Sequence, residues 1–303
     1  MATASVVIPT RGGATRLPTV LAALASQTHA DTEVVVVLDG DIDESARVAR
    51  TFADRLDLQV IEFPENRGRS AALSAGFQAA TGRVLIRCDD DLEPPPTHVE
   101  RHVAHHAGEP VGIIGMCPDV FPADNAYGRV YGVPVDQRLR RDAYALAPQE
   151  RWRLWSANVS VTRETYDGVG PYDDAFRAYG WEDIDWGYRL HRLGVPIRIP
   201  DDIEMDHHNP PLTVRERAER ALASGRSRRF FEAKHGLERA RVVAGTGVWD
   251  RAVGTLAGRL TDEASVGRYA APVDRMLPRL PAPVGHKLAA LVIEAAGRAA
   301  LSD

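Results

Sequence analysis

The sequence predicts an α/β protein, built on a mostly parallel sheet with helices on both faces and followed by a helical C-terminal region. Three observations support this fold class. Strand-like and helix-like segments alternate through the first half of the 303-residue chain. The strand-like segments are short apolar runs, typical of strands covered on both faces. After Pro210 and Pro211 the chain becomes rich in alanine, arginine and leucine. We therefore expect an α/β domain over residues 1–211 and a helical region over residues 212–303.

The elements predicted for the first half follow one another as strand, helix, strand. Strands are expected at residues 5–8, 33–38, 58–63 and 83–88, with helices at residues 16–26, 43–56 and 69–80. In the first helix, Leu17, Leu21 and Leu24 have the i, i+4, i+7 spacing of one amphipathic face. Ligands of parallel sheets bind at the carboxyl ends of the strands, so the polar residues that follow the strands are the site candidates.

The second half is less regular. We expect helices at residues 97–107 and 181–193, strands at residues 111–116, 155–161 and 195–199, and helices over residues 213–234 and parts of 237–303. Near the end, an apolar stripe with helical spacing comprises Leu288, Leu291, Val292 and Ala295. We expect this stripe to pack on the protein's own core. Acceptor recognition, dimerisation to a homodimer and docking on a surface are the alternative roles of the tail.

Charge and composition limit the function classes. The formal net charge is -5, so no basic field points to nucleic acid as a partner. Cys88 and Cys117 each lie within or at the end of an apolar run that is typical of a buried strand, and two cysteines make no disulfide framework, which favours a reducing, cytoplasmic setting. No apolar run reaches the ~20 residues of a membrane span, and the N-terminus lacks a signal-type segment. We expect a soluble protein whose C-terminal part is the candidate for peripheral membrane contact.

Three adjacent acids, Asp89, Asp90 and Asp91, end the fourth predicted strand. Adjacent carboxylates repel one another, and a bound cation would relieve that repulsion. Oxygen ligands suit Mg2+ or Mn2+, and a nucleotide diphosphate can complete the coordination shell. The alternative is an acidic turn that caps the following helix. The strand before the acids and the prolines after them favour the metal site.

Two later motifs carry acids and histidines. Glu182 and Asp183 open a predicted helix, either as a general base for an acceptor hydroxyl or as acids that favour a helix N-terminus. Trp181 and Trp186 would supply apolar surroundings that raise a carboxyl pKa. A histidine of the run Asp206-His207-His208 would complete the metal site begun by Asp91, the alternative being a polar loop. A further set at helical spacings, expected to be a solvated face, comprises His98, His102, His105 and His106.

A glycine-rich turn, Gly12-Gly13, separates the first strand from the first helix. Backbone N–H groups of such a turn can bind phosphate, although tight strand-to-helix turns also use glycine for backbone reasons alone.

The order and spacing of these motifs match those of a known enzyme family. The segments are Val6-Val7-Ile8-Pro9-Thr10, Arg16-Leu17-Pro18, Ser26-Gln27-Thr28, residues 34–39, Asn66-Arg67-Gly68-Arg69-Ser70-Ala71-Ala72, the acidic triplet, Gly180-Trp181-Glu182-Asp183 and His207-His208-Asn209-Pro210. With them, the chain resembles a family-2 glycosyltransferase of the GT-A fold over about residues 5–211. The helical tail has no counterpart in this resemblance.

The resemblance implies a role for each candidate residue. The nucleotide-binding residues would be Pro9, Thr10, Arg11, Asp39, Asn66, Arg67, Asp89 and Asp90. Asp91 would bind Mn2+ or Mg2+, with His207 preferred to His208 as the second ligand. Asp183 would be the general base and Glu182 would orient the acceptor, although Glu182 remains an alternative base. Asp41 remains an alternative to Asp39 as the nucleotide contact.

The reaction implied is an inverting transfer from a nucleotide-sugar donor, with UDP favoured and GDP or dTDP left open. The acceptor would be a carbohydrate, a lipid-linked or a small-molecule hydroxyl. The sequence lacks a Gln-x-x-Arg-Trp motif, which argues against a processive polymerase. Two alternatives remain at this point. Residues 12–19 also resemble the signature of a sugar-1-phosphate nucleotidyltransferase, and the fold alone is compatible with a non-catalytic nucleotide-sugar-binding protein.

Overall fold

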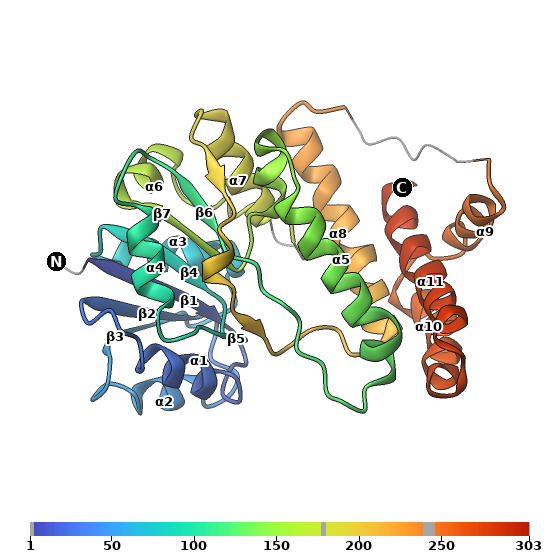
Figure 1. The fold of residues 1–303 in the computed structure, drawn as a ribbon, viewed down its shortest axis with the longest axis horizontal. Helices are drawn as coiled ribbons and strands as arrows, with labels where there is room; N and C mark the ends of the chain where they lie inside the picture. The colour runs from blue at the N-terminus through green and yellow to red at the C-terminus, as the bar shows by residue number, and fades with distance from the viewer. Residues whose placement is uncertain (1–2, 177–179, 239–245, 303) are drawn as a thin grey trace. The chain divides into compact units, whose positions relative to one another are not determined.

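Seven strands form one sheet in the order β3-β2-β1-β4-β7-β6-β8 (Figure 1). The structure is a computed structural model that describes residues 3–176, 180–238 and 246–302. The strands of this sheet are β1 Ala4–Thr10, β2 Thr32–Leu38, β3 Asp57–Glu62, β4 Val84–Cys88, β6 Gly112–Ile114, β7 Asn158–Thr162 and β8 Ile197–Arg198. The first four strands are parallel, and β7 is antiparallel to both of its neighbours. The mostly parallel sheet predicted from the sequence is confirmed.

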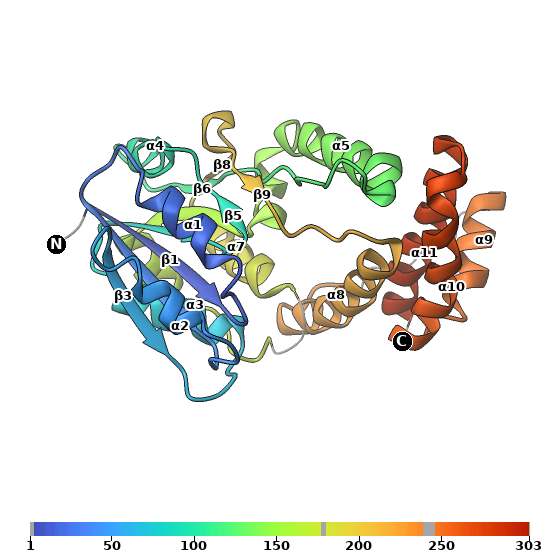
Figure 2. The ribbon, with the colours of Figure 1, turned by 90° about the horizontal axis from the view of Figure 1, so that it is seen from below.

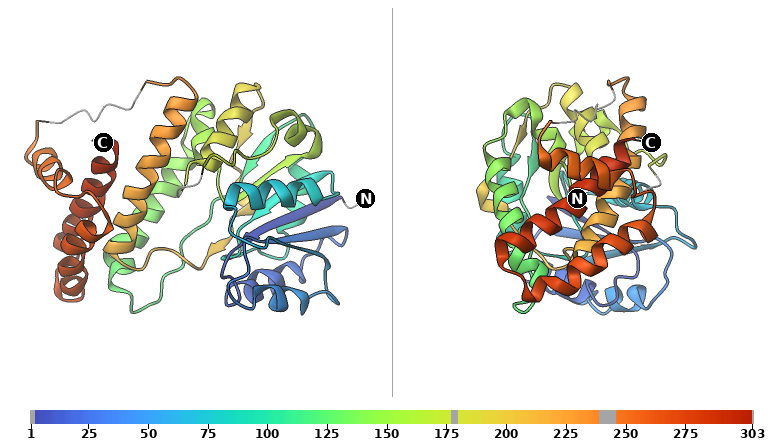
Figure 3. Two further views of the ribbon diagram at one scale, coloured as in Figure 1. Left: turned by 180° about the vertical axis from the view of Figure 1, so that it is seen from behind. Right: turned by 90° about the vertical axis from the view of Figure 1, so that its right-hand side faces the viewer.

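Helices cover both faces of this sheet, as the sequence predicts. The helices around the sheet are α1 Leu17–Leu24, α2 Ser45–Arg50, α3 Arg69–Ala79, α4 His98–His105, α6 Arg163–Val169 and α7 Glu182–Arg192. Leu21 of α1 shares a buried cluster with Val6 of β1. The next residue of β1, Val7, faces α3 on the other side, because a Cβ at Gly76 of α3 would lie 2.4 Å from Val7 Cγ1. Figure 3 (left) shows α3, in cyan, lying across the strands.

A second, two-stranded sheet lies beyond the acidic triplet. It consists of β5 Leu92–Glu93 and β9 Asp206–His207, paired antiparallel with Leu92 opposite His207. This pairing brings together two segments that are more than one hundred residues apart in the sequence. Neither strand is predicted from the sequence, because each contains only two residues and so has no periodic pattern.

The chain forms two compact units. The first contains residues 1–118, 140–177 and 182–208, and the second contains residues 119–139, 178–181 and 209–303. The second unit is helical, as predicted for the C-terminal region. Its C-terminal helices are α8 Val214–Lys234, α9 Val248–Ala257, α10 Glu263–Met276 and α11 Ala282–Ser302. Figure 2 shows α9, α10 and α11 clustered together. The predicted domain boundary between residues 211 and 212 stays a prediction.

The core of the second unit combines distant parts of the chain. Tyr127, Val130 and Tyr131 pack in one cluster with residues of α8, α10 and α11. Val292 and Ala295 of the predicted apolar stripe belong to the same cluster, with Leu288 and Leu291 packed against it, so the stripe does pack on the protein's own core. Among the described helices, including the 21-residue α8 and α11, none combines the length and apolar character that a bilayer-spanning helix needs.

Several predictions for the middle of the chain are wrong. A π-helical turn Gly128–Gly132, α5 Val133–Tyr144, a 3-10 helix Pro148–Leu154 and α6 have no predicted counterpart. The strand β7 begins at Asn158 rather than Trp155, and β6 ends at Ile114 rather than Met116, so Cys117 lies three residues beyond the end of that strand. Cys88, by contrast, ends β4 and is buried as expected, and the two cysteines form no disulfide.

The histidines of α4 do not form a solvated face. His98, His102 and His106 are buried, and only His105 of this set is partly exposed. His102 Nδ1 and His106 Nε2 each lie 2.7 Å from the Ser160 hydroxyl oxygen of β7. The prediction is wrong because a polar side chain on β7 provides hydrogen-bond partners that helical spacing alone cannot show. Burial lowers the pKa of His98 to about 3, so this histidine packs as a neutral side chain.

Candidate active site

The middle acid of the triplet closes the turn between β1 and α1. Asp90 accepts a hydrogen bond from the Thr10 hydroxyl at 2.5 Å, and Arg16 donates Nε and Nη2 to its two oxygens over 3.0 and 2.8 Å. These contacts follow from the sheet order, since β1 and β4 are neighbours and end at the same edge. Burial raises the pKa of Asp90 despite these donors. Both carboxylate oxygens of Asp90 thus have protein partners.

The glycine-rich turn has a structural explanation. A Cβ at Gly13 would lie 2.1 Å from the Thr10 hydroxyl oxygen, so this position accepts no side chain. The backbone N–H of Gly13 donates to the Ser45 hydroxyl over 2.9 Å, and that of Ala14 donates to Asp43 over 3.0 Å. These two N–H groups, which the sequence made candidates for phosphate binding, therefore have acceptors within the protein.

The end of β2 is tied to the loop before α3. Asp39 is 6% exposed and accepts hydrogen bonds from the backbone N–H of Arg67 at 2.6 Å and of Gly68 at 3.0 Å. Asn66 accepts a second bond from Gly68, and the Arg67 guanidinium stacks 4.5 Å from the Phe63 ring. The structure thus brings Asp39, Asn66 and Arg67 together. Of the residues at the end of β1, Pro9 and Thr10 are buried and Arg11 is exposed.

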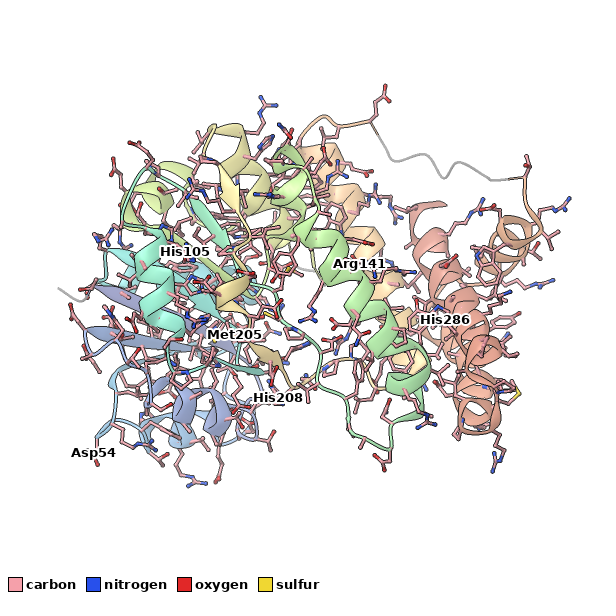
Figure 4. All side chains as sticks on the ribbon, viewed as in Figure 1. Asp54, His105, Arg141, Met205, His208 and His286 are labelled. Atoms are coloured by element: carbon pink, nitrogen blue, oxygen red, sulfur yellow. The ribbon has the colours of Figure 1, made fainter. Side chains whose placement is uncertain are left out.

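The third acid faces a histidine across the small sheet. Asp91 Oδ2 lies 3.4 Å from His207 Nε2, because Leu92 and His207 are paired in β5 and β9. Burial would raise the pKa of Asp91, but the hydrogen bond and charge of His207 outweigh it and lower that pKa. His208, labelled in Figure 4, instead lies 2.6 Å from Glu93. Of the two histidine side chains, that of His207 meets an acid of the triplet, whereas His208 contacts the triplet through its backbone N–H, which donates to the Asp91 carbonyl oxygen over 2.9 Å.

The first acid belongs to a charged network that reaches α7. Arg87 of β4 donates Nε and Nη2 to the two oxygens of Asp89 over 2.7 and 3.1 Å, and its Nη1 donates to Asp183 Oδ1. Arg69 of α3 lies 3.9 Å from Asp89 and 3.8 Å from Glu182. Burial would lower the pKa of Arg87, but Asp183 and Asp89 hold it well above its usual value. Arg87 is therefore cationic.

The two acids that open α7 have different environments. The side chain of Glu182 is 5% exposed, and that of Asp183 is 15% exposed and paired with Arg87. Burial, together with the neighbouring Asp183 charge, raises the pKa of Glu182 to about 7. Its Oε2 has no hydrogen-bond partner among the described residues. Glu182 therefore carries a proton up to about neutral pH, beside a carboxylate whose charge an arginine compensates.

The backbone before these acids is unusual. Gly180 has φ 79° and Trp181 has φ 74°, and a non-glycine residue in this left-handed region is strained. Trp181 is fixed by α8, where its indole N–H donates to the Ser224 hydroxyl over 2.9 Å and its ring lies 5.1 Å from that of Phe231. The helix predicted over residues 181–193 is α7, which begins at Glu182, so Trp181 lies just before it and not within it.

Three arginines of this site have no role predicted from the sequence. Arg16, Arg69 and Arg87 each contact an acid of the triplet. One signal could have revealed Arg87, which stands alone as a charge inside the apolar run 84–88. A charged residue in a buried strand requires an opposite charge nearby, and the acids that follow are the nearest candidates.

A family model described as "Glycosyl transferase family 2" matches residues 5–166. Among curated proteins, validoxylamine A glucosyltransferase of Streptomyces hygroscopicus subsp. jinggangensis is 32% identical over 223 residues, covering 64% of this chain and 53% of that protein. Hyaluronan synthase of Pasteurella multocida is 26% identical over 238 residues, covering 68% of this chain and 24% of that protein. The chain spans about half the length of the first of these relatives.

Solved structures show the same fold. A mannosyltransferase from Pyrobaculum calidifontis, determined with GDP-Man and Mn2+, superposes with a TM-score of 0.63 at 18% identity, covering 98% of this chain and 87% of that chain. S. aureus TarS in complex with UDP gives a TM-score of 0.56 at 14% identity, covering 98% of this chain and 91% of that chain. These likenesses confirm the predicted GT-A fold.

Proposed function

The chain belongs to glycosyl transferase family 2, and from that membership we propose that it transfers a sugar from a nucleotide diphosphate to a hydroxyl group of an acceptor. The observation that carries the proposal is the cluster of acids at the carboxyl edge of the sheet. Asp89 and Asp91 of the triplet and Glu182 and Asp183 of α7 come from distant parts of the chain, and Arg87 joins the two groups. Donor and acceptor would meet at this edge.

The donor side of the proposed site is formed by the ends of β1, β2 and β4. Asp39, with the loop that contains Asn66 and Arg67, would bind the nucleoside, and UDP is the nucleotide we propose. Pro9, Thr10 and Arg11 would line the same nucleotide. Asp89 would face the diphosphate. Asp90 would act indirectly, because its oxygens hold Arg16 and Thr10.

A divalent cation fits beside the triplet. Asp91 and His207 provide a carboxylate and an imidazole 3.4 Å apart on adjoining strands, both partly exposed. The described part of the chain contains no group of three or more histidine, cysteine or acidic side chains that could hold an ion alone. We therefore propose that Asp91 and His207 would hold Mn2+ or Mg2+ together with diphosphate oxygens. When bound, the ion would stabilise the negative charge of the leaving diphosphate.

The proposed reaction is a single in-line displacement with inversion. The acceptor oxygen forms a bond to the anomeric carbon while the bond from that carbon to the diphosphate breaks. Asp183, which is more exposed than Glu182, takes the proton of the acceptor hydroxyl. Glu182, protonated up to about neutral pH, would orient the acceptor as a hydrogen-bond donor. Holding both substrates in line supplies much of the rate acceleration.

The test is a panel of nucleotide sugars with Mn2+, read first by thermal shift and then by product release. A tight donor raises the melting temperature in proportion to ln(1 + [L]/Kd). Release of nucleoside diphosphate, with transfer to an acceptor, is the result we expect. Pyrophosphate release from a nucleoside triphosphate and a sugar phosphate would identify a nucleotidyltransferase instead. Binding without any turnover would identify a binding protein.

The test must also include acceptors of several chemical classes. Relatives of the chain bear names as different as validoxylamine A glucosyltransferase, undecaprenyl-phosphate 4-deoxy-4-formamido-L-arabinose transferase and hyaluronan synthase. One acceptor of each class therefore belongs in the panel, and we propose a hydroxyl-bearing small molecule or sugar as the first to try.

A further inference from the structure

Arg87 is a fully buried arginine of β4, two residues before Asp89. Its side chain has 0% exposure, and all three of its guanidinium nitrogens meet carboxylates. Two of them hold Asp89 at the end of the strand, and the third holds Asp183 in the first turn of α7. One side chain thus connects the donor-side acids with the acceptor-side acids.

We propose that Arg87 is a positioning residue for the transfer reaction, which fixes Asp183 relative to the donor-side acid Asp89. This inference rests on the proposed function, in which Asp183 takes the acceptor proton and the diphosphate lies beside the triplet. An in-line displacement needs the base and the leaving group at a fixed separation, since a misplacement of about 1 Å can cost about 100-fold in rate. Arg87 sets this separation through one rigid group.

The shape of the guanidinium is essential to this role. It is planar and its N–H donors point in fixed directions, so it can donate to both oxygens of Asp89 and also to Asp183. A lysine ammonium carries its donors on one nitrogen at the end of a flexible stem, so it cannot replace three separate nitrogens that meet both oxygens of Asp89 and Asp183 in fixed directions. Arg87→Lys therefore keeps the charge but loses the fixed geometry.

Arg69 has a different part in the same network. Its Nη1 lies 3.9 Å from Asp89 and 3.8 Å from Glu182, beyond hydrogen-bond distance, and its side chain is 49% exposed. Arg69 therefore contributes positive charge, whereas Arg87 contributes charge and geometry. The consequence is that loss of Arg69 should be tolerated better than loss of Arg87.

The first test compares rate constants for transfer from the donor found in the panel. For Arg87→Lys we expect kcat to fall about 10- to 100-fold, while the donor KM changes less than about 3-fold. A control is Arg189→Met, which removes an arginine whose Nε donates to Asp185 over 3.0 Å within the same helix α7. This control should lower the melting temperature and leave kcat near that of the native protein. Native kcat in Arg87→Lys would overturn the proposal.

The second test is a double-mutant cycle with Arg87→Met and Asp183→Asn. If Arg87 acts through Asp183, the kcat of the double variant should be no lower than that of Asp183→Asn alone. If the two residues act independently, the fold reduction in kcat of the double variant should be the product of the two single reductions. The double variant should also melt at a higher temperature than Arg87→Met, because it no longer buries an uncompensated Asp183 carboxylate. Multiplied rate losses with additive shifts in melting temperature would overturn the inference.

The melting part of the cycle separates this inference from the proposed function. It needs no substrate, so it measures the coupling of Arg87 and Asp183 even if the native protein transfers no sugar. A chain without transfer activity would end the proposed function, and with it the catalytic part of the inference. If the native protein transfers sugar but the melting-temperature shifts of the two single variants simply add in the double variant, the proposed function stands and only the inference about Arg87 is wrong.

Discussion

The three acids of the triplet each have a different partner, which explains how adjacent carboxylates coexist at one strand end. Asp89 is paired with Arg87, Asp90 with Arg16, and Asp91 lies beside His207. Asp89 and Asp90 therefore each have an arginine that compensates their charge, whereas Asp91 lies beside a histidine and is the acid proposed to bind the metal. Substitutions of the three residues should consequently have different effects: that of Asp89 on the position of Arg87, that of Asp90 on the β1–α1 turn, and that of Asp91 on metal binding.

Asp91→Ala should abolish the metal dependence of nucleotide binding and lower sugar transfer by at least about 100-fold, because it removes one of two protein ligands. Calorimetry of UDP binding with and without Mn2+ measures the first effect. The matched control is Asp54→Ala, an exposed acid far from the triplet in the sequence, which should leave both quantities unchanged. Full activity of the native protein in excess EDTA would show that transfer needs no divalent metal and that Asp91 is not a metal ligand.

Asp183→Asn should reduce transfer by roughly 10²–10⁴-fold, the usual contribution of general-base catalysis, because asparagine is nearly isosteric but accepts no proton. Donor binding should change little. Glu182→Gln keeps a hydrogen-bond donor and should act mainly on the KM for the acceptor. If Glu182→Gln were the slower variant and Asp183→Asn retained near-native kcat, the roles of the two residues would be exchanged.

The raised pKa of Glu182 has a consequence for stability. Its folded value of about 7 exceeds the ordinary 4.5, so between these pH values the folded protein holds a proton that the unfolded chain has lost. The contribution of Glu182 to the free energy of unfolding should therefore fall as pH rises from about 4.5 to 7, by on the order of 1–3 kcal/mol. Relative to Glu182→Gln, denaturant titrations should show this decline. A difference independent of pH would contradict the raised pKa.

The acids of the site can be predicted from the sequence more readily than the residues that pair with them. Asp91 and His207 are 116 positions apart in the sequence, and a motif can name both without stating that β5 and β9 pair them. The roles assigned to Asp39, Asn66 and Arg67 stay predictions, although the structure places the three together. Arg87 is not among the predicted site residues, because the pattern that indicates a ligand site is a polar residue after a strand, and Arg87 lies within one.

At the scale of elements, glycines decide how closely helices approach the sheet. Gly76→Ala in α3 should lower the free energy of unfolding by about 1–3 kcal/mol, because its Cβ would lie 2.4 Å from Val7 and 3.0 Å from Val37. This clash outweighs the gain of at most about 1 kcal/mol that alanine brings to a helix. Denaturant titration measures the change.

Gly168→Ala is the matched control in α6, where no atom lies within 4 Å of the added Cβ. It should leave the free energy of unfolding unchanged or raise it by up to about 1 kcal/mol. Equal effects of the two substitutions would mean that α3 does not pack against β1 and β2 as closely as the structure has it.

The elements of the first half were predicted well because each has a strong local pattern. Apolar runs such as residues 33–38 and the leucine spacing of α1 are sufficient without knowledge of the partners. The middle of the chain is predicted less well, because α5 is polar on average, with many charged residues, as in Gln137-Arg138-Leu139-Arg140-Arg141. Strands of two residues have no detectable period at all.

At the scale of the whole molecule, the second unit is discontinuous in sequence. Residues 119–139 belong with residues 209–303, and Tyr127, Val130 and Tyr131 share the core of the C-terminal helices. A chain that ends at Pro211 should therefore expose these side chains and become aggregation-prone, with a melting temperature well below that of the native protein. Light scattering and thermal unfolding of residues 1–211 check this. A soluble, monomeric fragment of native stability would show that the segment needs no C-terminal partner.

Protein synthesis adds a time order to this arrangement. Tyr131 leaves the ribosome long before Val214, the first residue of α8 that shares its core. At translation rates of about 5–20 residues per second, the intervening stretch of roughly 80 residues takes about 4–16 s. During that interval the side chains of Tyr127 and Tyr131 cannot be buried, because the helices that pack against them have not been synthesised, whereas the strands β1 to β4 can already pair. The nascent chain should therefore recruit ribosome-associated chaperones at this segment, and slow codons placed before residue 214 should lower the yield of folded protein.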